Sequence, residues 1–243
     1  MSNFIMQKLK EFFIGSGLVV VVWQLAHIII NRNVLPSPLP VFMAMPNLLN
    51  QNIVTHFTHS AYRVFVALSI SMILGLLVGI FASKSKILTS FIYFTYPIPR
   101  VALLPVVMVV FGLRDMSKII MITLIISYPI IIVVRDSVAS IPKETYNTVI
   151  ASGANWLQLF FYVTLPFAFG AVFSTLRVAL GTAIAILFFT ETYGARYGMG
   201  HFILDSWMRL NYIQMYGGIV LLGLTGFILF CIIDCVEEVF FKG

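Results

Sequence analysis

Long apolar runs constrain this chain more than any other feature of its sequence. Stretches of about 20 residues, such as 166–190 and 214–234, are dominated by Ile, Leu, Val, Phe, Ala and Gly. A helix of that length rises about 30 Å, the thickness of a bilayer's hydrocarbon core. Backbone groups in hydrocarbon need internal partners, which leaves helices or closed barrels. Barrel strands have short alternating patterns, so the continuous runs predict an all-helical integral membrane protein.

Composition agrees with this architecture. Hydrophobic residues make up 60% of the 243 residues and charged residues 10%, whereas soluble domains carry about 25% charged residues. The run that follows Lys8 and Lys10 continues to Ile30, longer than the roughly 7–15-residue core of a signal peptide, so we interpret it as the first span. We predict one transmembrane domain, 1–243, with six spans at about 12–30, 61–82, 87–111, 117–135, 166–190 and 214–234.

The distribution of lysine predicts the orientation. Six spans place both termini on one side of the membrane. The segments on that side hold Lys8, Lys10, Lys84, Lys86, Lys143 and Lys242, whereas Lys118 falls on the other side. With arginine included the division is seven cations against six, with Arg63 and Lys118 counted among the outer segments. Because cytoplasmic loops carry an excess of Lys and Arg, we predict cytoplasmic N- and C-termini and a cytoplasmic gap at 136–165.

The gap between the fourth and fifth spans contains the segment IPKETYNTVIASGANWLQLFFYVTLP (141–166). Pro142 suits a helix start, Gly153 can take positive φ, and Asn155 suits an N-cap. We therefore predict two helices with a turn at Gly153. The second should pack on the bundle through Trp156, Phe160 and Val163, and the first should expose Glu144, Tyr146, Asn147 and Thr148.

Two interpretations of this segment remain open on physical grounds. It is either a connecting loop that folds onto the bundle, or a short rigid helix offered to a cytosolic partner. Pro166 falls at the start of the fifth span, where the missing N–H costs little.

The third predicted span is unusual because it contains Pro97, Pro99 and Pro105 with Arg100 among them. Interior prolines kink or break helices. Non-helical backbone at membrane depth is tolerated against protein or a water-filled cavity. A charge within a span indicates a functional site by default, although an arginine near the interface can also extend its head group to water.

Two further ionisable residues lie in or near the fifth span. Arg177 either lines a path or makes a structural pair with an acid. Glu191 lies too far along the helix to pair readily with Arg177, so Arg196 or another arginine is the expected partner. With Tyr193 it is predicted to form an outer gate or a helix-breaking turn. Gly75 and Gly79 give the second span a small-residue face, for contact within the chain or across a dimer.

The spacing in the 136–165 gap resembles the loop of inner-membrane permeases of binding-protein-dependent ABC importers. That family carries Glu-Ala-Ala, three residues, Gly, nine residues and Ile/Val-x-Leu-Pro. Here Gly153 is followed by nine residues and then Val163-Thr164-Leu165-Pro166. The first triad departs from the pattern, because Asn147-Thr148-Val149 occupies its place.

Three other segments are similar to the nitrate/sulfonate/taurine-type permeases. They are LPSP (35–38), PIPRVALLPVVMVVFGL (97–113) and LRVALGTAIAILFFTETYGARYGMGHFI (176–203). In the last of these the family has an acid followed by a Gly-x-x-x-Gly-x-Gly turn, which corresponds to Glu191, Gly194, Gly198 and Gly200.

The resemblance implies a fold of six transmembrane helices of the type I importer kind, with a cytoplasmic coupling helix between spans four and five. It implies ATPase coupling through Glu144, Tyr146, Asn147, Thr148, Ile150, Ala151, Gly153, Ala154, Leu165 and Pro166. The charged and proline-rich positions are predicted to line the translocation path: Pro99, Arg100, Leu104, Pro105, Arg177, Glu191 and Tyr193.

The predicted function is that of a non-catalytic ABC importer permease in a bacterial or archaeal inner membrane. Its implied partners are cytosolic ATPase subunits, an extracytoplasmic solute-binding protein and a second copy of itself, with ATP used by the ATPase and no cofactor, metal or nucleic acid bound by this chain. The arginines and the net charge of +6 favour a small anionic or polar organic solute. The alternatives are a stand-alone secondary transporter or channel, and a membrane enzyme, for which the sequence offers no recognisable catalytic pair.

Overall fold

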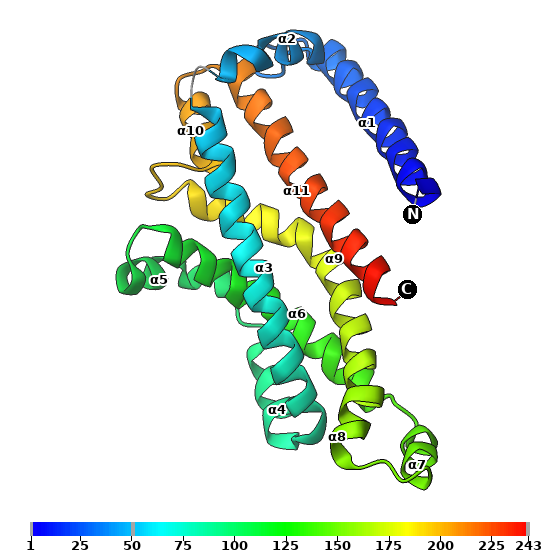
Figure 1. Cartoon of the computed structure of the whole chain (residues 1–243). Helices are drawn as coiled ribbons and strands as arrows, with labels where there is room; N and C mark the ends of the chain where they lie inside the picture. Colours follow the sequence, from blue (N-terminus) through cyan, green and yellow to red (C-terminus); the bar gives the residue numbers. More distant parts are fainter. Residues whose placement is uncertain (1, 50–51, 242–243) are drawn as a thin grey trace.

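The computed structural model describes residues 2–49 and 52–241, so Lys242 of the orientation argument lies outside the described residues. Within those ranges the regular structure is helical: α1 (Ser2–Ile30), α2 (Pro38–Leu48), α3 (Ile53–Lys84), α4 (Lys86–Thr95), η2 (Arg100–Leu103), α5 (Leu104–Phe111), α6 (Asp115–Ala139), α7 (Lys143–Ala151), α8 (Trp156–Leu159), η3 (Phe160–Thr164), α9 (Leu165–Glu191), α10 (Met199–Met208) and α11 (Tyr212–Phe241). Figure 1 shows α2 and α10 at one end of the molecule and α7 and α8 at the other.

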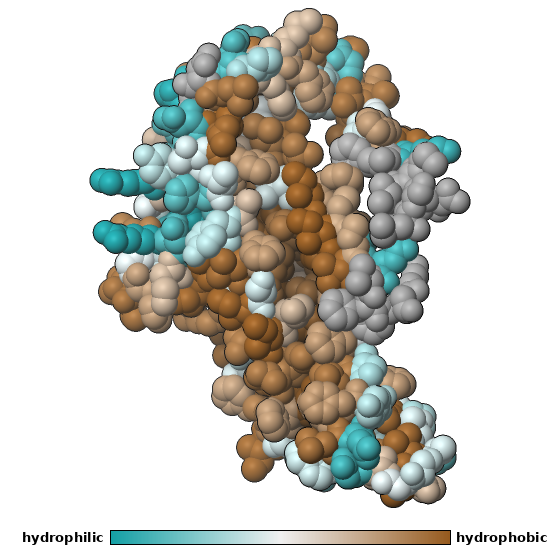
Figure 2. Space-filling model, in the orientation of Figure 1, coloured by the Kyte–Doolittle hydropathy of each residue, from teal (hydrophilic) through white to brown (hydrophobic). Residues whose placement is uncertain are grey.

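Five described helices are long and apolar enough to cross a membrane, and they coincide with five of the predicted spans. They begin or end outside the predicted bounds, because α3 starts at Ile53 and the fifth crossing starts at Trp156 and continues through α8 and η3 into α9. Figure 2 agrees with this, since hydrophobic residues cover the middle of the visible face and hydrophilic residues gather towards the α10 and α7 ends.

The predicted third span is not one straight helix. α4 ends at Thr95, and the segment that begins at Arg100 runs at 81° to it. The break contains Pro97 and Pro99, which donate no backbone hydrogen bonds. With 10 residues, α4 rises about 15 Å, half of the hydrocarbon thickness. The predicted third span, 87–111, is therefore a bent helix pair, as its interior prolines indicate.

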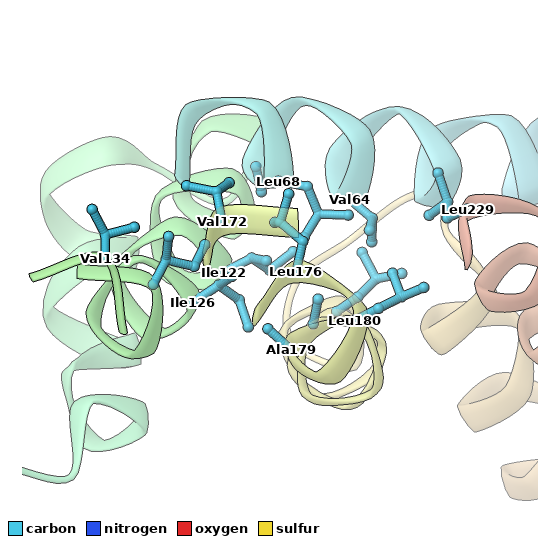
Figure 3. Packing of buried hydrophobic residues seen from close by; sticks show 14 of the residues in the cluster. Val64, Leu68, Ile122, Ile126, Val134, Val172, Leu176, Ala179, Leu180 and Leu229 are labelled. Carbon is cyan, nitrogen blue, oxygen red and sulfur yellow. The ribbon is translucent and has the colours of Figure 1, made fainter. Parts of the chain in front are cut away.

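The core lies where α3, α6 and α9 meet, the most extensive helix pairings in the fold being α3 with α6 and α6 with α9. Figure 3 shows these helices interlocking through buried aliphatic side chains, and α11 closes the cluster at one side. The labelled residues are Val64 and Leu68 of α3, Ile122, Ile126 and Val134 of α6, Val172, Leu176, Ala179 and Leu180 of α9, and Leu229 of α11.

Gly75 and Gly79 form the seam between α3 and α6. A Cβ atom on Gly75 would lie 2.3 Å from Cγ2 of Ile130, and one on Gly79 would lie 2.7 Å from Cβ of Val134. The small-residue face of this helix therefore packs within the chain, which answers the question that the sequence left open.

We expect Gly75→Ala to destabilise the protein by about 1–3 kcal/mol, because the added methyl group overpacks the seam. Gly223→Ala is the matched control, since nothing lies within 4 Å of a Cβ at that position of α11. Thermal unfolding of the detergent-solubilised protein measures both variants. A Gly75→Ala protein that melts at or above the wild-type temperature would contradict this account of the seam.

α1 stands apart from the core along most of its length, as Figure 1 shows. Its attachment lies near its C-terminal end, where Trp23 stacks on Tyr216 of α11 with ring centroids 5.3 Å apart and donates from Nε1 to the Pro36 carbonyl at 3.0 Å. None of the apolar window Phe13–Ile30 is buried within the molecule.

Candidate functional site

The segment between α6 and α9 forms the predicted helix–turn–helix. α7 ends in a turn at Gly153, whose φ is +85°. The Gly153 N–H donates to the Ile150 carbonyl at 2.9 Å and the Ala154 N–H donates to the Val149 carbonyl at 3.4 Å, the two bonds of a Schellman motif. Asn155 then caps the next helix through a reciprocal capping box with Gln158. Two terminal motifs in succession fix the angle between α7 and the following helix.

α7 presents one face to the bundle and the other to its surroundings. Tyr146 and Val149 pack against the core, and the Tyr146 hydroxyl lies 3.0 Å from the Thr164 hydroxyl. The predicted exposure of Tyr146 is therefore wrong. Ala154, beyond the turn, is half-buried, whereas the remaining predicted coupling residues of this helix and its turn are exposed: Glu144, Asn147, Thr148, Ile150, Ala151 and Gly153.

The apolar support of this segment differs from the prediction. Phe160 and Leu165 pack against the core and Val163 is buried, but Trp156 is 74% exposed and cannot act as an anchor. Between Trp156 and Val163 the chain forms η3, a π-helical turn over Phe160–Thr164, which changes the helical phase between the two residues. Pro166 is exposed in the first turn of α9.

Arg100 lies at the bend between α4 and α5. Its guanidinium carbon is 3.4 Å from the ring centroid of Tyr128 on α6, and Nη2 donates to the Thr95 carbonyl at 2.8 Å. The arginine thus satisfies one carbonyl at the end of α4 and stacks on an aromatic face, an arrangement that stabilises a cation away from bulk water.

A cavity of about 420 Å³ lies beside the Arg100 guanidinium, between the bend, α6 and α9. Three of its lining residues carry hydroxyl groups: Tyr96, Thr175 and Thr182. The others beside Arg100 are Ile125, Ile126, Pro129, Val178 and Ala179. Arg100 is the one predicted path residue among the cavity's lining residues. Leu104 is buried in a small cluster with Val107 and Met121, and Pro99 and Pro105 are exposed.

An ionic cluster of Ser60, Arg63, Asp115 and Glu191 lies at the opposite end from α7; Asp115 is half-buried and the other three residues are buried. Arg63 is 3% exposed and Glu191 is fully buried. Arg63 Nη1 donates to Glu191 Oε1 at 2.6 Å, and Arg63 Nε donates to Asp115 Oδ1 at 2.8 Å. The Ser60 hydroxyl lies 2.8 Å from the Glu191 carboxylate. We call these four residues the Arg63–Glu191 cluster.

The cluster holds the turn between α9 and α10. The Gly200 N–H donates to Glu191 Oε2 at 2.8 Å, and the Met199 N–H donates to Ser60 Oγ at 2.7 Å. Glu191 thereby places a carboxylate at the N-terminus of α10, where the helix dipole favours negative charge. Gly198 has a φ of +142°, and a Cβ there would lie 2.4 Å from the Glu191 carboxyl carbon. The glycine-rich turn is thus fitted around this carboxylate.

The structure separates the charged residues that were predicted to line one path. Arg177 forms ion pairs with two residues of α11, Asp234 at 2.8 Å and Glu237. Of the two predicted roles of Arg177, the structural pair with an acid is the one observed. Tyr193 is exposed and its ring meets Phe189 edge-on. Tyr128, which stacks on Arg100, and Asp115 in the cluster are 13 residues apart on α6, about 20 Å along the helix.

Sequence reasoning missed Arg63, Ser60, Asp115 and the fully buried Lys118, which donates to the Leu113 carbonyl at 2.7 Å. Arg63 fell within the predicted span 61–82, and a charge inside a span was the available signal; it was instead counted as an outer-loop charge. The expected partner of Glu191 was Arg196 or another arginine; Arg196 is exposed, and it is the other arginine, Arg63, that makes the ion pair. His56 and His59 belong to no group of three or more metal-ligating residues within the described part of the chain.

Comparison with known proteins places the chain in a family. Residues 67–242 match the model of the binding-protein-dependent transport system inner membrane component. The putative aliphatic sulfonates transport permease SsuC of Bacillus subtilis is 24% identical over 217 residues, which cover 86% of this chain and 79% of that protein. The formylaminopyrimidine transport permease ThiX of Halalkalibacterium halodurans is 24% identical over 227 residues, 91% of each chain.

A solved structure shares the fold. An inward-facing form of the MetNI methionine ABC transporter superimposes with a TM-score of 0.66 and 20% identity, over 77% of this chain and 95% of that chain. The family match covers most of the sequence, and the long apolar helices and the fold agree with it. The chain belongs to the family of inner-membrane components of binding-protein-dependent transport systems and is an ABC importer permease.

Proposed function

We propose that this permease and a second copy of itself form the path of an importer, with cytosolic ATPase subunits bound at α7 and a solute-binding protein delivering solute on the other side. The observation that carries the proposal is the rigid mounting of α7. A Schellman motif and a capping box hold it, Tyr146 and Val149 attach it to the core, and its outer face is exposed. A helix held in this way can transmit a movement of a bound soluble partner to α6 and α9.

The charge distribution supports cytoplasmic termini and a cytoplasmic α7. Arg63 and Lys118 are buried and hydrogen-bonded within the protein, so they are not counted among the cationic residues of the outer loops. That leaves Arg32, Arg114, Arg196 and Arg209 on the outer side, four of the original six, against seven on the α7 side. The asymmetry required by the positive-inside rule is therefore larger than the sequence alone suggested.

An unpartnered face of α9 supports assembly with a second copy. Its exposed residues recur at helical spacing, and most are small or carry a hydroxyl: Ser174, Val178, Gly181, Thr182, Ala185 and Phe189. Small residues allow close approach of helices within a membrane. Because Val178 and Thr182 also line the Arg100 cavity, two copies meeting near this face would bring their cavities together into one path.

The cavity favours an anionic solute. It contains one cationic side chain, Arg100, and no acidic one among its lining residues, with threonine and tyrosine hydroxyls as further hydrogen-bonding groups. A planar guanidinium and hydroxyl donors suit a sulfonate or carboxylate oxygen. The sulfonates named for the Bacillus subtilis relative have this chemistry, whereas formylaminopyrimidine, named for the second relative, is the competing neutral class.

The function is tested with proteoliposomes that hold the permease purified with its co-purifying ATPase, supplied with the solute-binding protein and a panel of alkanesulfonates, taurine and aminopyrimidines. We expect ATP-dependent uptake of an anionic member. Uptake without ATPase or ATP would instead establish the stand-alone transporter, and uptake of the aminopyrimidines alone would overturn the anionic solute class.

Arg100→Ala is expected to reduce uptake of the anionic solute about 10- to 100-fold, because a hydrogen bond to a charged group contributes about 1.5–3 kcal/mol. Lys86→Ala removes an exposed cation at the start of α4, outside the cavity, and should leave uptake unchanged. Initial uptake rates compare the two. Equal rates in both variants would exclude Arg100 from the path.

A further inference from the structure

A second and larger cavity lies at the α7 end and has no part in the proposed transport path. Its volume is about 770 Å³, within the range of roughly 300–1,000 Å³ that small-molecule sites occupy. It is bounded by the last turns of α3 and α6 on one side and by α7, α8 and η3 on the other. We call it the α7 groove. Leu77, Phe81, Trp156 and Phe161 supply much of its apolar lining.

The groove joins an apolar interior to a cationic rim. Lys84, the last residue of α3, and Lys143, the first residue of α7, both line it, and no acidic residue does. Within residues 2–49 and 52–241 neither lysine forms an ion pair with a carboxylate. An occupant therefore meets hydrocarbon along the walls and two positive charges at the edge.

The groove lies at the ends of two membrane-crossing helices. α3 and α6 are membrane-crossing helices, and they end at Lys84 and Ala139 beside the groove. Leu77 lies seven residues before Lys84, so the walls reach about 10 Å from the helix end towards the hydrocarbon. Trp156, 74% exposed, is the amphipathic side chain that is enriched at the level of lipid head groups.

These features identify a lipid in preference to a protein as the occupant. The apolar walls run back from the two lysines along the membrane-crossing helix α3 to Leu77, towards the lipid and away from a soluble ATPase subunit. A second copy seated on this groove through a two-fold axis would bring two pairs of unneutralised lysines together, which costs electrostatic energy. An anionic phospholipid matches both the apolar walls and the lysines, because cations beside a membrane attract its phosphate.

We propose that the α7 groove binds an anionic phospholipid, with an acyl chain along Leu77, Phe81 and Phe161 and the phosphate between Lys84 and Lys143. The lipid would then touch α3, α6 and α7 at once. Through these contacts it would brace the mounting of α7 against the bundle.

Trp156 provides a direct probe. The chain has three tryptophans, so a Trp23→Phe/Trp207→Phe protein reports from Trp156 alone. This full-length protein is reconstituted in nanodiscs of phosphatidylcholine with increasing fractions of phosphatidylglycerol. Acyl chains of either the anionic or the neutral lipid are brominated, and fluorescence quenching gives the relative affinity of the two lipids for the groove.

We expect brominated phosphatidylglycerol to quench Trp156 in preference to brominated phosphatidylcholine, and Lys84→Gln/Lys143→Gln to weaken this preference about fivefold for each lysine removed. The matched control is Lys10→Gln/Lys86→Gln, which removes two exposed lysines outside the groove and should keep the preference. Equal quenching by both lipids, an equal loss in both double variants, or no quenching by either lipid would overturn the proposal.

Discussion

Arg63→Met is expected to lower the free energy of unfolding by about 3–5 kcal/mol, the usual cost of removing one partner of a buried ion pair. Glu191 would remain fully buried beside Ser60 without its ion-pair partner, and Asp115 would lose the guanidinium 2.5 Å away. The neutral side chain also gives up the hydrogen bond to the Tyr197 carbonyl. Glu191 and Ser60 also hold the α9–α10 turn, so the substitution should destabilise that turn as well as the Arg63–Glu191 ion pair.

Thermal unfolding of the solubilised protein measures this effect, with Arg196→Met as the matched control because that arginine is exposed in the same turn. Glu191→Gln in the Arg63→Met background should recover part of the loss, since a neutral amide keeps hydrogen bonds without an unpaired buried charge. If Arg63→Met and Arg196→Met melt together, the cluster contributes little to stability.

Gly153→Val is expected to abolish most ATP-driven uptake while the protein still folds and inserts. The glycine has a φ of +85°, and a Cβ there would meet nothing within 4 Å, so the penalty comes from the backbone and not from a clash. A β-branched residue strongly disfavours this conformation. Relief of the strain would redirect α7 while the core packing of α3, α6 and α9 stays in place.

Gly153→Asn is the matched control, because asparagine tolerates positive φ and the space around the Cβ position is open. We expect near-normal uptake in Gly153→Asn, at least tenfold slower uptake in Gly153→Val, and continuing ATP hydrolysis by the associated ATPase in both. Full uptake in the valine variant would mean that the angle of α7 is irrelevant to coupling.

The features that were predictable from the sequence depend on local pattern. The apolar runs located five crossings because length and hydrophobicity are properties of single segments, and Gly153 and Asn155 marked the turn after α7 because their conformational preferences are intrinsic. The bend in the third span was signalled by Pro97 and Pro99, but no local pattern gives its 81° angle.

The features that escaped prediction depend on distant contacts or on helical phase. Arg63 and Glu191 are 128 residues apart, and no local pattern connects them. Trp156 is exposed, although the regular helical pattern put it on one face with Phe160 and Val163, and the π turn of η3 lies between it and Val163. α10 was missed because it is short and lies between a glycine-rich turn and Arg209.

The spacing of the Arg63–Glu191 cluster along the chain has a consequence for biogenesis. Asp115 follows Arg63 by 52 residues and Glu191 follows it by 128. At a synthesis rate of about 5–20 residues per second, the arginine is made roughly 6–26 s before its buried partner. Within that interval Asp115, at the start of α6, is the carboxylate of the cluster that has been made. We infer that α3 and α6 pair first, along the Gly75–Gly79 seam, and that α9 then completes the ionic cluster as it enters the membrane.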